Sequence, residues 1–210
     1  MQRKWRREWE HRKEGQLAAR STNYGREVLK TLTRTILPPV AAATMLLSSM
    51  IMPVYANPTG GQITAGTGSI AQTGNTMNIT QNTNKMSINW QSFNIAKNET
   101  VNFQQPGTSA IALNRVVGNN ASSIYGHLNA NGQVFLINTN GVLFAPGSSV
   151  KIGGLVASTL NISDRDFQNG NYKFSGTGGS VVNQGTLTAT DGGYVALLGN
   201  QVANQGVVMA

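Results

Sequence analysis

The chain has 210 residues, no cysteine and a formal net charge of +8. Residues 1–56 hold ten of the sixteen Lys and Arg residues against four Glu, a net of +6, so residues 57–210 carry a net of only +2. No basic stripe with interleaved aromatic residues follows residue 56, which excludes nucleic acid as a partner of the later part. The lack of cysteine excludes a disulfide scaffold, so packing and hydrogen bonds must hold the fold together.

Residues 1–56 have the pattern of an unusually long secretory signal peptide. Basic residues precede an apolar core at 40–52, and Val54-Tyr55-Ala56 follows with small residues at the two positions that specify cleavage. A membrane anchor or a buried helix is the alternative, but thirteen residues span roughly 20 Å as a helix, and a hydrocarbon core is about 30 Å thick. We therefore expect the general secretion machinery to receive this segment and cleavage to follow Ala56. The mature part, 57–210, is then expected not to be embedded in a membrane.

Beyond residue 56 the sequence predicts short β-strands and almost no helix. Apolar residues alternate with polar ones through Met86, Ile88 and Trp90, and the alternation resumes at Phe93 and Ile95. Later apolar runs are equally short, and Gly, Asn or Pro-Gly pairs close each of them. Only residues 163–168 fit a turn of helix or a loop. This pattern indicates an all-β fold.

An internal repeat distinguishes a solenoid from a sandwich or a barrel. Residues 182–187 recur at 203–208 in the pattern x-Asn-Gln-Gly-x-apolar, offset by 21 positions. A period of about 20 residues fits one turn of a parallel β-helix, whose strands stack about 4.8 Å apart. The 154 residues after the leader would give about seven turns. Asparagines that recur at the corners are expected to form hydrogen-bonded ladders along the axis.

Asn and Gly build the corner between two apolar runs at 134–137 and 142–144. Residues 138–141 read Asn-Thr-Asn-Gly, and both residue types favour tight turns. This corner belongs to a series of segments that resembles, in order, the N-terminal secretion domain of two-partner-secretion exoproteins, the filamentous haemagglutinin family. The segments are 88–95, 101–103, 114–116, 132–142 and 156–160.

The resemblance implies a right-handed parallel β-helix with an N-terminal cap. It also implies recognition by a cognate outer-membrane β-barrel transporter through that partner's periplasmic POTRA domains. The family motif Asn-Pro-Asn-Gly-Ile is matched by Asn138, Thr139, Asn140, Gly141 and Val142, with Thr139 in place of proline. A second family motif, Asn-Pro-Asn-Leu, has no clean counterpart, because residues 82–85 share only its asparagines.

These matched residues also fit a purely structural role. The 138–141 corner can be a turn, a secretion signal or both, because a turn must form before it is recognised. Arg115 is a candidate partner contact, with a salt-bridged or stacked structural residue as the alternative. Trp90 and Phe93 fit core or cap packing better than a ligand platform.

Residues 57–210 contain few side chains of the types that catalyse reactions. Residues 57–210 hold four acidic residues and one histidine, His127. Asp164 and Asp166 are two apart, but in the segment expected to be a loop or helical turn. A zinc site or a histidine-based triad cannot be assembled from this set, so no metal or other cofactor is expected and the module is predicted not to be an enzyme.

The sequence therefore predicts a secretion-targeting module of a large exoprotein, with an adhesin or haemagglutinin as the full-length protein. It would be secreted or reach the cell surface through the periplasm of a Gram-negative bacterium. Residues 201–210 lack a polar cap, so we expect 57–210 to be the start of a longer β-solenoid. The alternatives are the passenger of a single-chain autotransporter adhesin and, less favoured, a fragment of a β-helical polysaccharide-active enzyme.

Overall fold

The computed structural model describes residues 57–210, so the expected cleavage site at Val54 and Ala56 lies outside the described residues. The first strands are β1 (Gln62–Ala65), β2 (Gly68–Thr73), β3 (Thr76–Gln81), β4 (Lys85–Trp90), β5 (Thr100–Gln104), β6 (Ile111–Val116), β7 (Ser122–Ile124), β8 (His127–Ala130) and β9 (Gln133–Ile137). They are followed by β10 (Val142–Phe144), β11 (Ser149–Ile152), β12 (Gly154–Ser158), the helix α3 (Asp164–Asn169), β13 (Ser180–Asn183), β14 (Thr186–Ala189), β15 (Val195–Leu198), β16 (Gln201–Asn204) and β17 (Val207–Met209).

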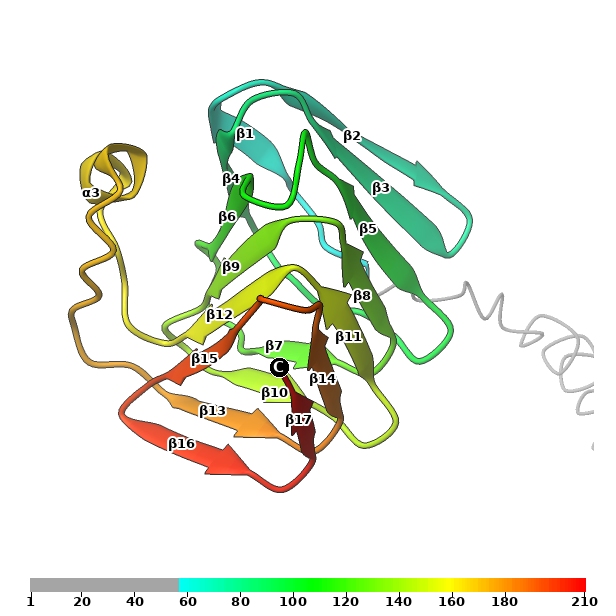
Figure 1. Cartoon of the computed structure of the whole chain (residues 1–210). Coiled ribbons are helices and arrows are strands. Elements are labelled where there is room, and N and C mark those ends of the chain that lie inside the picture. The colour runs from blue at the N-terminus through cyan, green and yellow to red at the C-terminus, as the bar shows by residue number, and fades with distance from the viewer. Residues whose placement is uncertain (1–56) are drawn as a thin grey trace, which may run out of the picture. The chain divides into compact units, whose positions relative to one another are not determined.

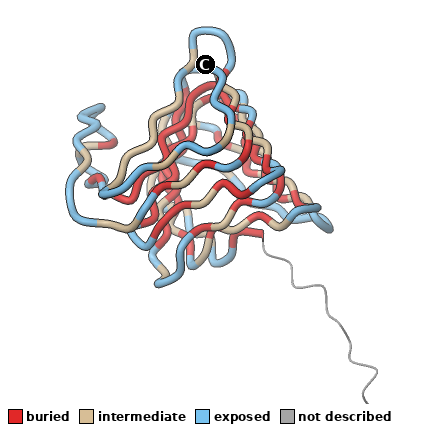
Figure 2. Tube along the Cα trace, turned by 90° about the horizontal axis from the view of Figure 1, so that it is seen from below, coloured by how far each residue is buried: buried red, intermediate tan, exposed pale blue. Residues whose placement is uncertain are grey.

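The strands wind into a β-solenoid with three walls (Figure 1). One sheet has the order β1-β4-β6-β9-β12-β15, the second β16-β13-β10-β7, and the third β17-β14-β11-β8-β5-β3-β2. The chain passes from one wall to the next, so that β8, β9 and β10 make one turn and β11 starts the next above β8. Viewed at right angles, buried residues line the inside of these stacked turns (Figure 2). The predicted parallel β-solenoid is confirmed.

The strand register reproduces the repeat seen in the sequence. Val182 pairs with Ala203 between β13 and β16, and Leu187 pairs with Val208 between β14 and β17, both 21 positions apart. The expected number of seven turns is wrong, however. Six parallel strands of the seven-stranded sheet define about six turns, because the chain also spends residues on an antiparallel cap and on the excursion that contains α3.

The N-terminal cap consists of two antiparallel strands at the start of the solenoid. β1 pairs antiparallel with β4, and β2 pairs antiparallel with β3. Every other strand pairing among the named strands is parallel. β1 and β2, rather than the first parallel strands β4 and β3, are therefore the N-terminal edges of their sheets.

Apolar side chains that point inward form one continuous core along the axis. Trp90 and Phe93 are both nearly fully buried in it, with an edge-to-face contact at 5.6 Å between ring centroids. They are therefore core residues, as expected. The predicted run of strand through Phe93 and Ile95 is not formed, since Ile95 makes only an isolated bridge to Ile124.

Amide side chains stack in register on successive turns. At the β13–β14 corner the Nδ2 of Asn183 donates to Oδ1 of Asn204 at 2.8 Å, and the Nε2 of Gln184 donates to Oε1 of Gln205 at 2.9 Å. A second ladder on the seven-stranded sheet joins Asn78, Asn102 and Asn129 through bonds of 3.0 Å. The predicted asparagine ladders are confirmed, at a corner and also along a sheet face.

Residues 160–179, called the strap below, leave the solenoid after β12 and return at β13 (Figure 1). The strap contains α3, so residues 163–168 form the helical turn that was one of the two expected alternatives, rather than a loop. Ser163 caps the helix, its Oγ accepting a hydrogen bond from the Asp166 N–H at 3.0 Å, and Gly170 ends it with φ of 81°.

The strap covers the outer face of the six-stranded sheet. Phe167 is fully buried on this outer face. The strand residues around it alternate along the sequence with the inward-pointing ones, so their side chains point away from the solenoid axis. The second apolar cluster consists of Ile111, Leu113, Phe135, Ile137, Val156, Ile162 and Phe167, with Phe174, Ala196 and Leu198 packed against it. This wall of the solenoid is therefore apolar on both faces.

Candidate functional site

The 138–141 corner is a four-residue turn between β9 and β10. The Gly141 N–H donates to the Asn138 carbonyl oxygen at 3.1 Å, which closes the turn. Gly141 has φ of 136°, a backbone conformation open to glycine and strained for other residues. The Asn/Gly composition thus serves local geometry first, as the turn interpretation predicted.

Asn138 is the centre of the corner. It is fully buried, and its Oδ1 accepts from the Asn140 backbone N–H at 3.0 Å and from Asn140 Nδ2 at 3.2 Å. Its Nδ2 donates to the Asn120 carbonyl oxygen and to Ser122 Oγ, both at 3.0 Å. The side chain therefore fixes the corner internally and bonds it to the preceding turn of the solenoid.

The corner is also bonded through its backbone to the turns on either side. The Ser122 N–H, in the preceding turn, donates to the Gly141 carbonyl oxygen at 3.0 Å. The Gly179 N–H, at the returning end of the strap, donates to the Thr139 carbonyl oxygen at 2.8 Å. Asn140 adds a bond from its Nδ2 to the Gly118 carbonyl oxygen at 2.9 Å.

Exposure divides the five motif residues into two groups. Asn138, Gly141 and Val142 are buried, whereas Thr139 and Asn140 are exposed. The side-chain amide of Asn140 is already hydrogen-bonded within the fold. Of the two exposed motif residues, Thr139 is therefore the one whose side chain is more available to a partner. A partner of the folded domain would meet Thr139 and Asn140 here, and contact with Asn138 or Val142 would require an unfolded corner.

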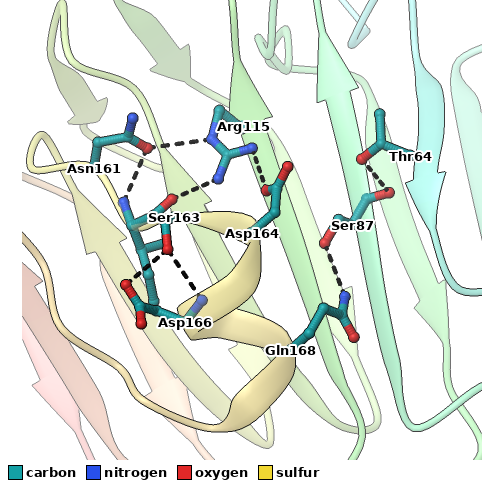
Figure 3. Close-up of polar contacts among 9 residues, drawn as sticks. Thr64, Ser87, Arg115, Asn161, Ser163, Asp164, Asp166 and Gln168 are labelled. Atoms are coloured by element: carbon teal, nitrogen blue, oxygen red, sulfur yellow. Dashed lines mark hydrogen bonds and ion pairs between the residues drawn. The ribbon is translucent and has the colours of Figure 1, made fainter.

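Arg115 does not lie in the corner; it bonds to the strap (Figure 3). Its guanidinium donates to Asp164 Oδ1 at 2.7 Å, to Asn161 Oδ1 at 3.2 Å and to the Ile162 carbonyl oxygen at 2.6 Å. Arg115 therefore has the salt-bridged structural role that was the alternative to a partner contact. Its contact with a partner stays a prediction.

Sequence reasoning missed Lys85 as a structural residue. Its Nζ donates to the carbonyl oxygens of Phe167 at 3.0 Å and Gln168 at 2.9 Å, at the C-terminal end of α3. The ammonium also lies 5.8 Å from the Phe167 ring centroid and 5.6 Å from that of Tyr172. No local signal marks this role, because the partners lie more than 80 positions away.

The acidic residues considered for catalysis have structural partners. Asp164 pairs with Arg115, and Asp166 Oδ2 accepts from Ser163 Oγ at 2.7 Å. His127 is exposed on β8. Within residues 57–210 no group of three or more His, Cys, Asp and Glu residues could hold a metal ion. No helix in this part of the chain is long and apolar enough to cross a membrane.

The fold defines a β-helical domain, and comparison with known proteins gives its class. The family model described as the TPS secretion domain matches residues 54–210. The chain therefore belongs to the TPS, or two-partner secretion, domain family. Membership identifies it as the secretion domain of an exoprotein of Gram-negative bacteria and implies a cognate transporter as the second partner.

Three relatives, one solved structure and two curated proteins, come from Haemophilus influenzae. The crystal structure of the HMW1 secretion domain superimposes with a TM-score of 0.66 and 33% identity, covering 72% of this chain and 42% of that one. A Heme/hemopexin-binding protein of strain Rd is 39% identical over 164 residues, which are 73% of this chain and 18% of the relative. Another protein of that name is 41% identical over 103 residues, covering 49% of this chain and 11% of the relative. The chain thus spans less than a fifth of the length of these curated relatives, neither of which is named as an enzyme.

Proposed function

We propose that residues 57–210 target a large exoprotein for export by binding the POTRA domains of a cognate outer-membrane β-barrel transporter. In this proposal residues 1–56 direct the chain through the general secretion machinery to the periplasm and are removed after Ala56. The domain then crosses the outer membrane and nucleates the β-helix outside. The family match over residues 54–210 carries the proposal.

The corner supports recognition of an unfolded chain. Since Asn138 and Val142 are buried in the solenoid, their side chains are available to a partner only before the corner forms. A transporter that reads these residues must therefore bind before folding. Folding outside the cell then withdraws them, which would favour release; burial of a large apolar side chain contributes roughly 1.5–3 kcal/mol. Arg115 is a further proposed contact at this stage, when its bonds to the strap have not formed.

The surface activity of the full-length exoprotein is a separate proposal. We propose an adhesin or haemagglutinin as the general class. The names of the two curated relatives favour a second candidate, in which the full-length protein binds haem or hemopexin. Binding of haemin and of hemopexin by the secreted full-length protein, compared with its adhesion to host cells, distinguishes these candidates.

Secretion of the chain from cells with and without the candidate transporter tests the export proposal. Asn138→Ala is compared with Asn183→Ala, because Asn183 is equally buried at another corner and its Oδ1 likewise accepts a backbone N–H two residues on, from Gly185 at 3.1 Å. We expect export to require the transporter and to fall more in Asn138→Ala than in Asn183→Ala at matched stability. Export without any transporter would overturn the proposal, and equal losses would reduce the 138–141 corner to a turn.

A binding assay separates recognition before folding from recognition of the folded domain. Immobilised POTRA domains are presented with urea-unfolded chain at the moment of dilution and with the refolded chain. We expect capture of the unfolded chain only. Equal capture of the folded chain, abolished by Thr139→Arg on the exposed side of the corner, would place recognition on the native surface instead.

A further inference from the structure

The strap is held at both ends of α3 by cations from two neighbouring strands. Arg115 on β6 bonds to the Ile162 carbonyl oxygen and to Asp164, at the start of the helix (Figure 3). Lys85 on β4 bonds to the carbonyl oxygens of Phe167 and Gln168, at the end of the helix. An ammonium ion at helix C-terminal carbonyls is favourable, because these groups otherwise lack donors.

The apolar surface beneath the strap is assembled from three successive turns. Leu113 comes from β6, Phe135 from β9 and Val156 from β12. Phe167 contacts Phe135 edge to face, with 6.0 Å between ring centroids. The parts of this surface from β6, β9 and β12 come together only after β12 has paired with β9, so the strap cannot dock on them until four strands of this wall, β4, β6, β9 and β12, are in place. Ala196 and Leu198 of β15 pack against the same cluster and complete it later in the chain.

The strap also breaks the usual contact rule of a solenoid. Each repeat normally touches only its neighbours, so turns can unfold one at a time from an end. The hydrogen bond between Asn183 and Asn204 joins adjacent turns, and its partners are 21 positions apart in the sequence. The partners of the two bonds from Lys85 to the strap are 82 and 83 positions apart. Gln168 Nε2 donates to Ser87 Oγ at 3.4 Å and likewise reaches back to β4.

We propose that the strap is a latch that closes after β12 has paired and makes the turns from β4 to β12 open as one unit. This inference deepens the proposed function and rests on it for its role in export. A chain that emerges N-terminus first would fold its early turns reversibly, and closure of the strap would then oppose their unfolding and return. The latch itself is a property of the folded chain and does not depend on which transporter exports it.

Hydrogen exchange with mass spectrometry on the full chain tests the latch. In pulse-labelled refolding, we expect amides of residues 160–179 to gain protection after those of β6, β9 and β12. In the native state, Lys85→Gln combined with Phe167→Ala should raise exchange in β4 and β6 at least tenfold. The matched control is Lys151→Gln, an exposed lysine on β11 that does not touch the strap, and it should leave exchange in β4 and β6 unchanged.

Several outcomes would overturn the inference. Protection of the strap before β12, or unchanged exchange in β4 and β6 when the strap is released, would show that it is only a covering loop. If the double variant does not fold, Lys85→Gln alone provides the test, since it removes the contacts of the ammonium group and keeps the Phe167 ring in the core. A threefold or greater rise in the exchange of β4 is then expected, and no rise contradicts the latch.

Export assays distinguish failure of the latch from failure of the proposed function. With the transporter present, Lys85→Gln should lower the amount of protease-resistant domain outside the cell by at least twofold relative to Lys151→Gln. Equal amounts from the two variants would contradict the role in export while leaving the exchange results standing. Transporter-independent export of the unaltered chain would instead contradict the proposed function.

Discussion

The ammonium group of Lys85 lies 3.0 Å from the carbonyl oxygen of Phe167, 82 positions later in the chain. Lys85 lies on β4, the first parallel strand of the six-stranded sheet. Phe167 lies in the strap, which follows β12, the fourth parallel strand of that sheet. In an array of stacked turns such a bond is unusual, because it bypasses the intermediate turns. It makes the stability of the N-terminal turns depend on residues much later in the sequence.

Phe167→Ala should destabilise the domain strongly. The ring is fully buried in the outer apolar cluster, so its removal leaves a cavity and is expected to lower the free energy of unfolding by about 3–5 kcal/mol. Urea denaturation followed by circular dichroism measures the change. The control is Tyr125→Ala, at a side chain 47% exposed, which should shift stability by less than about 0.5 kcal/mol. Similar values for both variants would mean that the strap contributes little.

Asn138→Ala should destabilise the chain by about 2–3 kcal/mol, because it removes the donor to the buried Ser122 hydroxyl and to the Asn120 carbonyl. Asn138→Asp keeps the acceptor for the Asn140 N–H but not the donor, so we expect a comparable loss. Chemical denaturation of both variants checks this. A loss confined to Asn138→Ala would show that the bond accepted from Asn140 matters more than the donated ones.

Thr139→Pro should stabilise the corner. Thr139 occupies the second position of the turn, where proline is favoured, and no backbone hydrogen bond is donated by its N–H within residues 57–210. Restricting the unfolded chain is expected to raise the free energy of unfolding by about 0.4–1 kcal/mol. The midpoint of urea denaturation should rise without a change in its slope. A fall would indicate that the φ of residue 139 is incompatible with proline.

Gly141→Ala should cost about 1–3 kcal/mol, the usual range for a residue held in a sparsely populated conformation. The φ of 136° is unfavourable for alanine, and its Cβ would lie 3.3 Å from that of Ala121. The matched control is Gly107→Ala, where no atom lies within 4 Å of the added Cβ. Thermal unfolding of the pair separates backbone strain from the general effect of replacing glycine, and equal midpoints would refute the strain argument.

Stability should fall as pH rises above about 10, the ordinary pKa of tyrosine. Burial raises the pKa of Tyr172 and of Tyr194, and for Tyr194 the nearby Tyr172 adds to the rise. Between the unfolded and folded pKa values the folded state holds more protons, so the free energy of unfolding decreases with pH there and is unaffected well below pH 10.

Denaturation between pH 8 and about 11.5 measures this dependence. The double variant Tyr172→Phe and Tyr194→Phe should lose less stability across that range than the unaltered chain. It also lacks the bond from Tyr194 OH to Gln133 Oε1 at 2.7 Å, so the slopes rather than the absolute values are compared. Equal slopes would show that other groups control the alkaline behaviour.

The solenoid and its asparagine ladders could be predicted because they are encoded locally and repeatedly. The same Asn-Gln-Gly triplet at 183–185 and 204–206 fixes both the period and the rungs. The 138–141 turn was predictable for a similar reason, since Asn and Gly have the required conformational preferences. Which residues of this turn are exposed depends on the turns above and below, and the local sequence does not contain that information.

The contacts of the strap could not be predicted, because the hydrogen-bond partners of Lys85 and Arg115 lie 46 to 83 positions later in the sequence. One signal was present: four consecutive apolar residues at 134–137 mark a strand whose two faces are both covered. An alternating strand would have faced water on one side. A count that assigns the residues of the cap and of the strap to solenoid turns gives seven turns, whereas the structure has about six.

The two ends of the strap meet where it leaves and rejoins the solenoid. Thr159 Oγ1 donates to the Gly179 carbonyl oxygen at 3.0 Å, and Asn161 and Ser175 form an antiparallel bridge. β10 and β13 on one wall, like β12 and β15 on another, keep the parallel pairing found elsewhere, although about 40 positions separate their partners. This site can therefore accept insertions or deletions without shifting any later strand, and it offers evolution a place to vary the surface of an otherwise strictly repetitive domain.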